Sequence, residues 1–336
     1  MILVAGGLGF IGSHVALTLL AQGQEVVLVD NLANSNLQVL EHLEYIANMY
    51  IPFVKVDVRN TPALNKVFEQ YPIDTVIHAA GFKSLEESLQ KPLEYYNDNV
   101  SCIMSLLRSM QRSGVRKLIH LSSMTVYGQS SLSLNEEMEL NFNYPNPYVK
   151  SQQMIEEIIR DTFQTDNEWR IAILRLGNVA GAFEHGGLGE YIPPLPKNII
   201  PLAMQVALGQ REVIELRKST ETEDGSLERS FVHVIDVCRS IHASLYWLST
   251  QQQHCCEVIN IAGEVSSIRH VLSILAETTN QSIPVIDSEY YFSELAQIGS
   301  QSNKAKTLLG WTAHKSLKQM IEDQWRFYQN ILSVKN

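Results

Sequence analysis

Three glycines at a fixed spacing near the start of the chain indicate a phosphate-binding turn. Gly6 ends the short apolar run ILVAG, and Gly9 and Gly12 lie between this run and a stretch with helical apolar spacing. Gly6 would permit the tight turn, Gly9 a close approach of backbone to a pyrophosphate, and Gly12 close packing of helix on strand. The amino end of that helix would then face the negative phosphates of a dinucleotide.

An acidic residue at the end of the second predicted strand selects between dinucleotides. Asp30 lies 18 residues beyond Gly12. Its carboxylate would accept hydrogen bonds from the adenosine ribose and would repel a 2′-phosphate. No arginine follows it in DNLANS, and we therefore expect NAD rather than NADP. Asp57, in VDVRN after the third predicted strand, is a candidate partner for the adenine amino group.

A tyrosine at the start of a predicted helix is the candidate acid and base. Tyr148 stands in NPYVKSQQ, and a free phenol, with a pKa of about 10, is a poor base at neutral pH unless a cation stabilises the phenolate. A side chain four residues on shares the same helix face, but that residue is Gln152. Lys150, two residues on, is rotated by roughly 200° and should point elsewhere.

Composition argues against nucleic-acid and membrane partners. The chain has 336 residues, of which 45% are hydrophobic, and a net charge of −10, which suits neither nucleic acid nor an anionic membrane. No apolar run is long enough to predict a membrane span, and we expect neither a signal peptide nor a metal site. The cysteines form no spaced framework, which is typical of reduced thiols in a cytoplasmic protein. They are Cys102, Cys238, Cys255 and Cys256.

Alternating strands and helices must position these residues. Continuous apolar runs predict strands at 2–6, 25–30, 53–58, 74–80, 115–123 and 170–179. Helical patterns lie between them, for example at 13–23 and 92–114. This alternation predicts an α/β, Rossmann-type fold, with a doubly wound, mostly parallel sheet covered by helices on both faces.

A change of pattern near residue 180 predicts a smaller α/β lobe. The segment 181–198 is rich in glycine and proline and indicates a loop. We expect an NAD-binding domain over 1–178 and a substrate-binding lobe over 179–336, with about 229–262 packing back on the first domain. The substrate should lie between them, near the carboxyl ends of the strands.

Taken together, these motifs resemble a known family. GGLGFIGSH, DNLANS, DTVIHAAGFKS, ESLQKPLEYYNDNV, TVYG, NPYVKS and TEDG with FVHVIDV occur in order at the spacings of the extended short-chain dehydrogenase/reductases. The resemblance covers about residues 1–330 and is closest to the UDP-glucose 4-epimerase branch. It implies epimerisation of a nucleotide sugar by transient oxidation at sugar C4, with NAD as cofactor.

The resemblance also implies roles for particular residues. Tyr148 would be the acid/base at the C4 oxygen, Ser123 would hydrogen-bond that oxygen, and Arg229 would contact the substrate diphosphate. NAD would be held by Gly6, Gly9, Phe10, Ile11, Gly12, Asp30, Asn31, Asp57, Val58, Ala79, Ala80, Gly81, Lys83, Asn99, Tyr148 and Gln152. The UDP-hexose would contact Lys83, Ser123, Thr125, Tyr148, Asn178, Asn198, Leu216, Arg229 and Tyr291. A homodimer through helices at about 92–112 and 147–165 is a further implication.

The substrate side departs from the family pattern. Leu176 and Gly177 stand where aromatics are usual, and Leu216 where an aromatic usually stacks on uracil. Tyr291 lies near the place of an arginine that usually clamps the diphosphate. Three hypotheses therefore remain open: a UDP-hexose 4-epimerase, a catalytically degenerate NAD-binding protein, and an epimerase or oxidoreductase with another substrate. A dehydratase is disfavoured, since SSMTVYG lacks a carboxylate before VYG.

Overall fold

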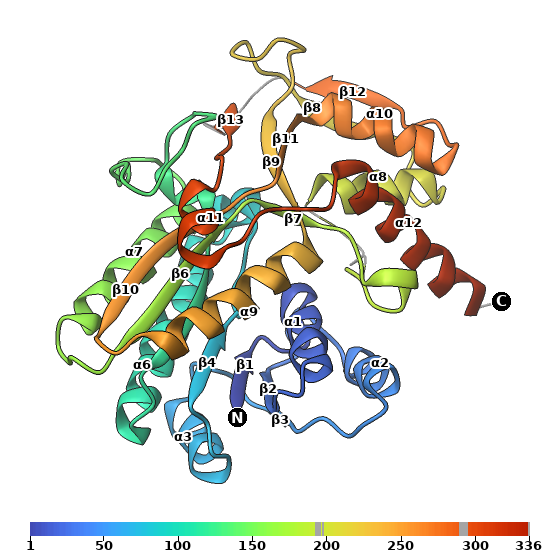
Figure 1. The fold of residues 1–336 in the computed structure, drawn as a ribbon. Coiled ribbons are helices and arrows are strands. Elements are labelled where there is room, and N and C mark those ends of the chain that lie inside the picture. The colour runs from blue at the N-terminus through green and yellow to red at the C-terminus, as the bar shows by residue number, and fades with distance from the viewer. Residues whose placement is uncertain (192–195, 197, 289–294, 335–336) are drawn as a thin grey trace.

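The computed structural model describes residues 1–191, 196, 198–288 and 295–334. Its centre is a seven-stranded sheet in which every pairing is parallel, as the apolar runs predict (Figure 1). In spatial order the strands are β10 (Cys255–Ile261), β6 (Arg170–Leu176), β5 (Lys117–Ser123), β4 (Thr75–His78), β1 (Ile2–Ala5), β2 (Val26–Asp30) and β3 (Phe53–Lys55). The Rossmann-type prediction is confirmed.

Both faces of this sheet are covered by helices because alternate strand residues point to opposite sides. In β1, Ile2 and Val4 join one apolar core while Leu3 and Ala5 join the other. The first core is closed by α1 (Phe10–Ala21), α2 (Leu37–Ala47), α9 (Val234–Thr250) and α11 (Asn303–Leu309). The second is closed by α3 (Thr61–Gln70), α6 (Ser101–Ser113) and α7 (Pro147–Phe163).

The smaller lobe is built around β9 (Glu228–His233), which contacts three short strands. It pairs antiparallel with β11 (Glu264–Ser267) and parallel with β7 (Asn178–Ala180) and β13 (Gln297–Ile298). A separate parallel pair consists of β8 (Ile214–Arg217) and β12 (Val285–Ser288). The apolar core of this lobe also includes side chains of α8 (Ile199–Ala207), α10 (Ile268–Thr279) and α12 (Leu317–Val334). The short 3-10 turn η3 (Glu184–Gly186) contacts α12.

Segments after residue 229 return to the main sheet: α9 packs against α1, and β10 forms the sheet edge beside β6. The division of the chain at residue 178 stays a prediction. The crossing from one sheet to the other occurs at Gly177, between β6 and β7. A Cβ atom there would lie 2.8 Å from the backbone oxygen of Ser230, so the close approach of the two sheets favours glycine.

The predicted helix at 92–114 is divided into three parts. It consists of α5 (Pro92–Tyr95), a wider π-helical turn η1 (Tyr96–Val100) and then α6. The preceding helix α4 (Leu85–Gln90) is short. The sequence analysis did not predict this turn, because π-helical turns are rare and occur mostly as single turns inside α-helices. None of the described helices is long and apolar enough to cross a membrane.

Candidate active site

The glycine turn leaves the first backbone N–H groups of α1 accessible to a hydrogen-bond acceptor. Gly9 is the N-cap residue and has no side chain to occupy the first N–H groups of the helix. Gly6 has a φ of +79°, and a Cβ on Gly12 would lie 2.0 Å from the oxygen of Gly6. Phe10 and Ile11 open the helix and are half-buried. The turn therefore fits the dinucleotide phosphates that its spacing predicts.

A cavity of about 150 Å³ lies beyond the carboxyl ends of β1, β2, β3 and β4. Nine of the residues predicted to hold the cofactor line it, namely Gly6, Gly9, Asp30, Asn31, Asp57, Val58, Ala79, Ala80 and Gly81. The sequence prediction missed the others, which are Ala33, Asn34, Ser35, Val56, Arg59, Phe82, Asp98 and Cys102. Strand ends of a parallel sheet are the usual place for such a ligand.

The carboxylate of Asp30 is fixed by three donors at the edge of the cavity. One oxygen accepts from the backbone N–H of Leu8 at 3.1 Å. The other accepts from the N–H of Leu32 at 2.9 Å and from the hydroxyl of Ser35 at 2.8 Å. An oriented carboxylate lining the cavity suits a ribose diol and opposes a 2′-phosphate.

Asp57 is held in place by an arginine that the sequence prediction overlooked. Arg59 donates from Nε and Nη2 to its two carboxylate oxygens at 3.0 and 2.6 Å, and also pairs with Asp98. Asn31 donates to the same carboxylate at 3.2 Å. The Arg59 hydrogen bond is the main reason that the pKa of Asp57 falls to about 2. An arginine two residues beyond an acid at a strand end is a signal that could have predicted this pair.

Tyr148, Ser123 and Thr125 meet as the motifs predict. Asn146 caps α7 by accepting the N–H of Val149 at 3.2 Å, which sets Tyr148 on the first turn. The hydroxyl oxygens of Ser123 and Thr125 lie 2.9 Å apart, and both side chains are close enough to the phenol of Tyr148 to influence its pKa. Burial raises the pKa of Tyr148, and the two neighbouring hydroxyls oppose this by lowering it. Neither hydroxyl carries a charge, so the phenol has little help in ionising.

Gln152 lies one turn after Tyr148 and is only 7% exposed. Its Oε1 atom is buried and has no hydrogen-bond partner among the described residues. A buried amide oxygen of this kind needs a donor, and a ribose hydroxyl would supply one. The residues present thus fit a dinucleotide here as well as at the glycine turn.

Two other predicted residues are engaged within the protein. The amide of Asn99 accepts from the N–H of Phe82 at 2.8 Å and donates to its carbonyl at 3.1 Å and to Ser151 at 3.0 Å. It therefore fixes the loop after β4 from the π-helical turn. The Nζ atom of Lys83 lies 3.1 Å from Glu190 and 5.8 Å from the centre of a phenyl ring, that of Phe10.

A buried ion pair supports the strand that carries Ser123. Arg175, on β6, donates to both oxygens of Glu156, on α7, at 3.0 and 2.6 Å. Ser122 donates to the same carboxylate at 2.6 Å. The guanidinium also lies 4.6 Å from the ring centre of Tyr127. This network links the helix of Tyr148 to the strand of Ser123.

The motifs, the fold and this geometry agree with a comparison to known families. Residues 2–270 match the NAD dependent epimerase/dehydratase family. The chain belongs to this family. It is 35% identical over 332 residues to a UDP-glucose 4-epimerase of Neisseria meningitidis serogroup C, covering 98% of this chain and 97% of the relative. A UDP-glucose 4-epimerase 2 of Oryza sativa subsp. japonica is 37% identical, with 97% and 81% covered.

Solved structures of relatives have the same fold. A UDP-glucose-4-epimerase from Stenotrophomonas maltophila, with bound NAD and formylated UDP-arabinopyranose, superposes with a TM-score of 0.93 at 31% identity, covering 99% of each chain. A Bifidobacterium longum UDP-glucose 4-epimerase, in complex with NAD+ and UDP, has a TM-score of 0.93 at 32% identity, with 98% of each chain covered.

In this family member the predicted substrate residues of the small lobe differ in exposure. Leu216 is 4% exposed and belongs to the apolar core of the lobe. Asn178 is exposed at the start of β7, and Asn198 is the half-buried N-cap residue of α8. Arg229 is buried, and its Nη1 atom donates to the carbonyls of Glu228 and Ala296 at 2.9 and 3.2 Å. Tyr291 lies outside the described residues.

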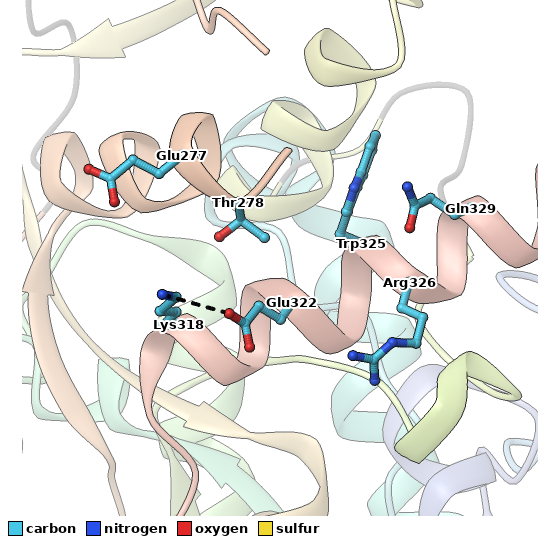
Figure 2. Close-up of a pocket in the computed structure, with 7 residues that line it drawn as sticks. All are labelled: Glu277, Thr278, Lys318, Glu322, Trp325, Arg326 and Gln329. Carbon is cyan, nitrogen blue, oxygen red and sulfur yellow. Dashed lines mark ion pairs between the residues drawn. The ribbon is translucent and has the colours of Figure 1, made fainter. Parts of the chain in front are cut away.

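A second hollow, of about 370 Å³, lies between α10 and α12 on the small lobe (Figure 2). Charged side chains dominate it, and Figure 2 shows the ion pair of Lys318 and Glu322 along α12. No residue predicted for catalysis or binding lines it. Within the described residues, no group of three His, Cys, Asp or Glu side chains could hold a metal ion.

Proposed function

We propose that this chain is an NAD-dependent UDP-hexose 4-epimerase that interconverts UDP-glucose and UDP-galactose. The observation that carries the proposal is the convergence of Tyr148, on the first turn of α7, with the paired hydroxyls of Ser123 and Thr125. Its support is the dinucleotide cavity and the match, over nearly the whole chain, to relatives named UDP-glucose 4-epimerases. Two solved relatives hold NAD together with UDP or a UDP-sugar.

The chain's own side chains would orient the sugar and move one proton. When bound, NAD supplies a reversible hydride acceptor for the sugar carbon. The glycine turn, Asp30 and Asp57 would hold it at the cavity. Tyr148 would take the proton from the C4 hydroxyl and later return it, because a phenol can do so when its oxygen is within hydrogen-bond reach. Ser123 would keep the C4 oxygen beside that phenol, and burial of the site would exclude water.

Proton NMR of UDP-galactose incubated with the purified chain and NAD tests the proposal. We expect the anomeric signal of UDP-glucose to appear with time. Tyr148→Phe removes a single oxygen and is the matched control, in which the signal should stay absent. If the wild-type chain binds NAD but forms no product, the catalytically degenerate alternative takes the place of this proposal.

Asp57 provides a test of the cofactor site that does not depend on turnover. We propose that its carboxylate accepts a hydrogen bond from the adenine amino group, and Arg59 keeps it ionised at any working pH. Asp57→Asn should weaken NAD binding by about tenfold, since a hydrogen bond to a charged group contributes about 1.5 kcal/mol. The measurement is titration calorimetry with NAD and with its hypoxanthine analogue, which carries a carbonyl instead of the amino group.

Wild type should prefer NAD over the hypoxanthine analogue, and Asp57→Asn should lose most of that preference. An equal preference in both proteins would contradict the role given to Asp57. Glu69→Gln, a change of the same charge on the exposed surface of α3, is the control and should leave both affinities unchanged.

We also infer a homodimer through α6 and α7, as in the family that the motifs resemble. Met104 and Met154 are large apolar side chains exposed on these two helices. Light scattering should then give twice the chain mass of 37.9 kDa, and a monomer mass would contradict the inference.

The four free cysteines support a cytoplasmic location, which fractionation of the source cells would test.

A further inference from the structure

Arg217 reaches from the small lobe to the helix beside the candidate catalytic tyrosine. It is the last residue of β8, where Ile214 and Leu216 are buried in the core of the lobe. Because strand residues alternate, Arg217 lies on the opposite side from these two. Its Nη2 atom is 3.2 Å from Oε2 of Glu86, on α4. This contact joins residues 131 positions apart in the chain.

The helix α4 that Arg217 contacts lies against the start of α7. Asn146, two residues before Tyr148, donates to the carbonyl of Leu85 at 3.1 Å and accepts from Ser88 at 3.2 Å. Leu85 packs on the cluster of buried side chains that contains Tyr148. The guanidinium of Arg217 therefore reaches the helix against which the start of α7, with Tyr148, is held.

The contact of Arg217 with Glu86 can be exchanged for one with a phosphate at small cost. The side chain of Glu86 is 60% exposed, and an exposed ion pair contributes little to stability. A guanidinium binds carboxylate and phosphate oxygens with the same forked geometry. Glu86 therefore holds Arg217 in an orientation that suits a phosphate group.

We propose that Arg217 binds the diphosphate of the nucleotide-sugar substrate and leaves Glu86 to do so. This inference about Arg217 rests on the proposed function. It gives the substrate a second arginine contact, in addition to the one expected from Arg229. The substrate class is a nucleoside diphosphate sugar, whose diphosphate offers oxygens to more than one guanidinium. The proposal for Arg217 concerns the residue after Leu216 and a contact with phosphate, and the sequence prediction that Leu216 contacts the substrate stays a prediction.

Calorimetric titration of the NAD-loaded chain with UDP and with uridine tests the role of Arg217. Arg217→Ala should weaken UDP binding by about 10- to 100-fold, as expected for loss of a charge-assisted hydrogen bond, and should leave uridine binding within twofold. Lys218→Ala is the matched control, because it removes the same charge at the next residue, which pairs with Asp287 at 3.6 Å. It should change neither affinity. Glu86→Gln should tighten UDP binding about two- to threefold.

The outcomes separate this inference from the proposed function. If wild type binds UDP and Arg217→Ala binds it equally well, the role of Arg217 is wrong and the proposed function stands. A parallel loss of UDP and uridine would assign Arg217 a structural role and would overturn the inference. If the wild-type chain binds no UDP, the proposed function fails and the inference fails with it. Arg217→Lys, which keeps the charge, should recover part of the UDP affinity.

Discussion

Replacing Gln152 by lysine is expected to raise kcat for UDP-galactose by about 10- to 10³-fold at neutral pH. Burial raises the pKa of Tyr148 above its ordinary value, so only a small fraction of the phenol is ionised. A cation within about 4–6 Å lowers such a pKa by about 1–3 units. Each unit means a tenfold larger phenolate fraction below the pKa. Gln152 occupies the position from which a lysine would act, one helical turn from Tyr148.

The pH profile distinguishes this cause from a general improvement of the site. Turnover by wild type should rise about tenfold per pH unit through the neutral range, because ionisation of the phenol limits it. In Gln152→Lys the rising limb should move to lower pH, since the cation stabilises phenolate and not phenol. Gln152→Met, similar in length but neutral, should show neither gain nor shift. A gain without a displaced limb would contradict this account.

The local motifs could be predicted because each is contained in one strand–turn–helix unit. Gly6 and Gly12 are only six residues apart in the chain and lie in close contact. Tyr148 and Gln152 are separated by one turn of the same helix. Ser123 lies near Tyr148 because β5 ends at Ser123 and the turn that follows it contacts α7. For such residues the spacing along the chain is enough to predict which side chains lie close together.

The other contacts of the site join residues from different elements, and the spacing within a motif does not predict them. Arg59 and Asp98 lie 39 residues apart, and Arg175 and Glu156 belong to different elements. The register of β8 on β12 decides that Leu216 points into the core and Arg217 away from it. A shift of one residue would exchange these two positions. A sequence pattern can therefore place a residue on a strand without showing whether its side chain faces the core.

Breaking the buried ion pair of Arg175 and Glu156 is expected to destabilise the protein strongly. Arg175 and Glu156 are almost completely buried, with side-chain exposures of 2% and 0%. The Nη1 atom of Arg175 already has no hydrogen-bond partner among the described residues. Glu156→Gln keeps the shape but leaves a buried guanidinium without its counter-charge. We expect a loss of about 3–5 kcal/mol in the free energy of unfolding, the usual cost of breaking a buried pair on one side.

Urea denaturation of the two neighbouring variants measures this cost against a control. Glu157→Gln changes the next residue of the same helix, where the carboxylate is 53% exposed and lies 3.9 Å from Arg160. That exposed pair should contribute less than about 1 kcal/mol. The midpoint should therefore fall sharply for Glu156→Gln alone, at an unchanged slope. Equal midpoints would mean that Arg175 finds water or another partner, and that the pair does not fix Ser123 against the helix of Tyr148.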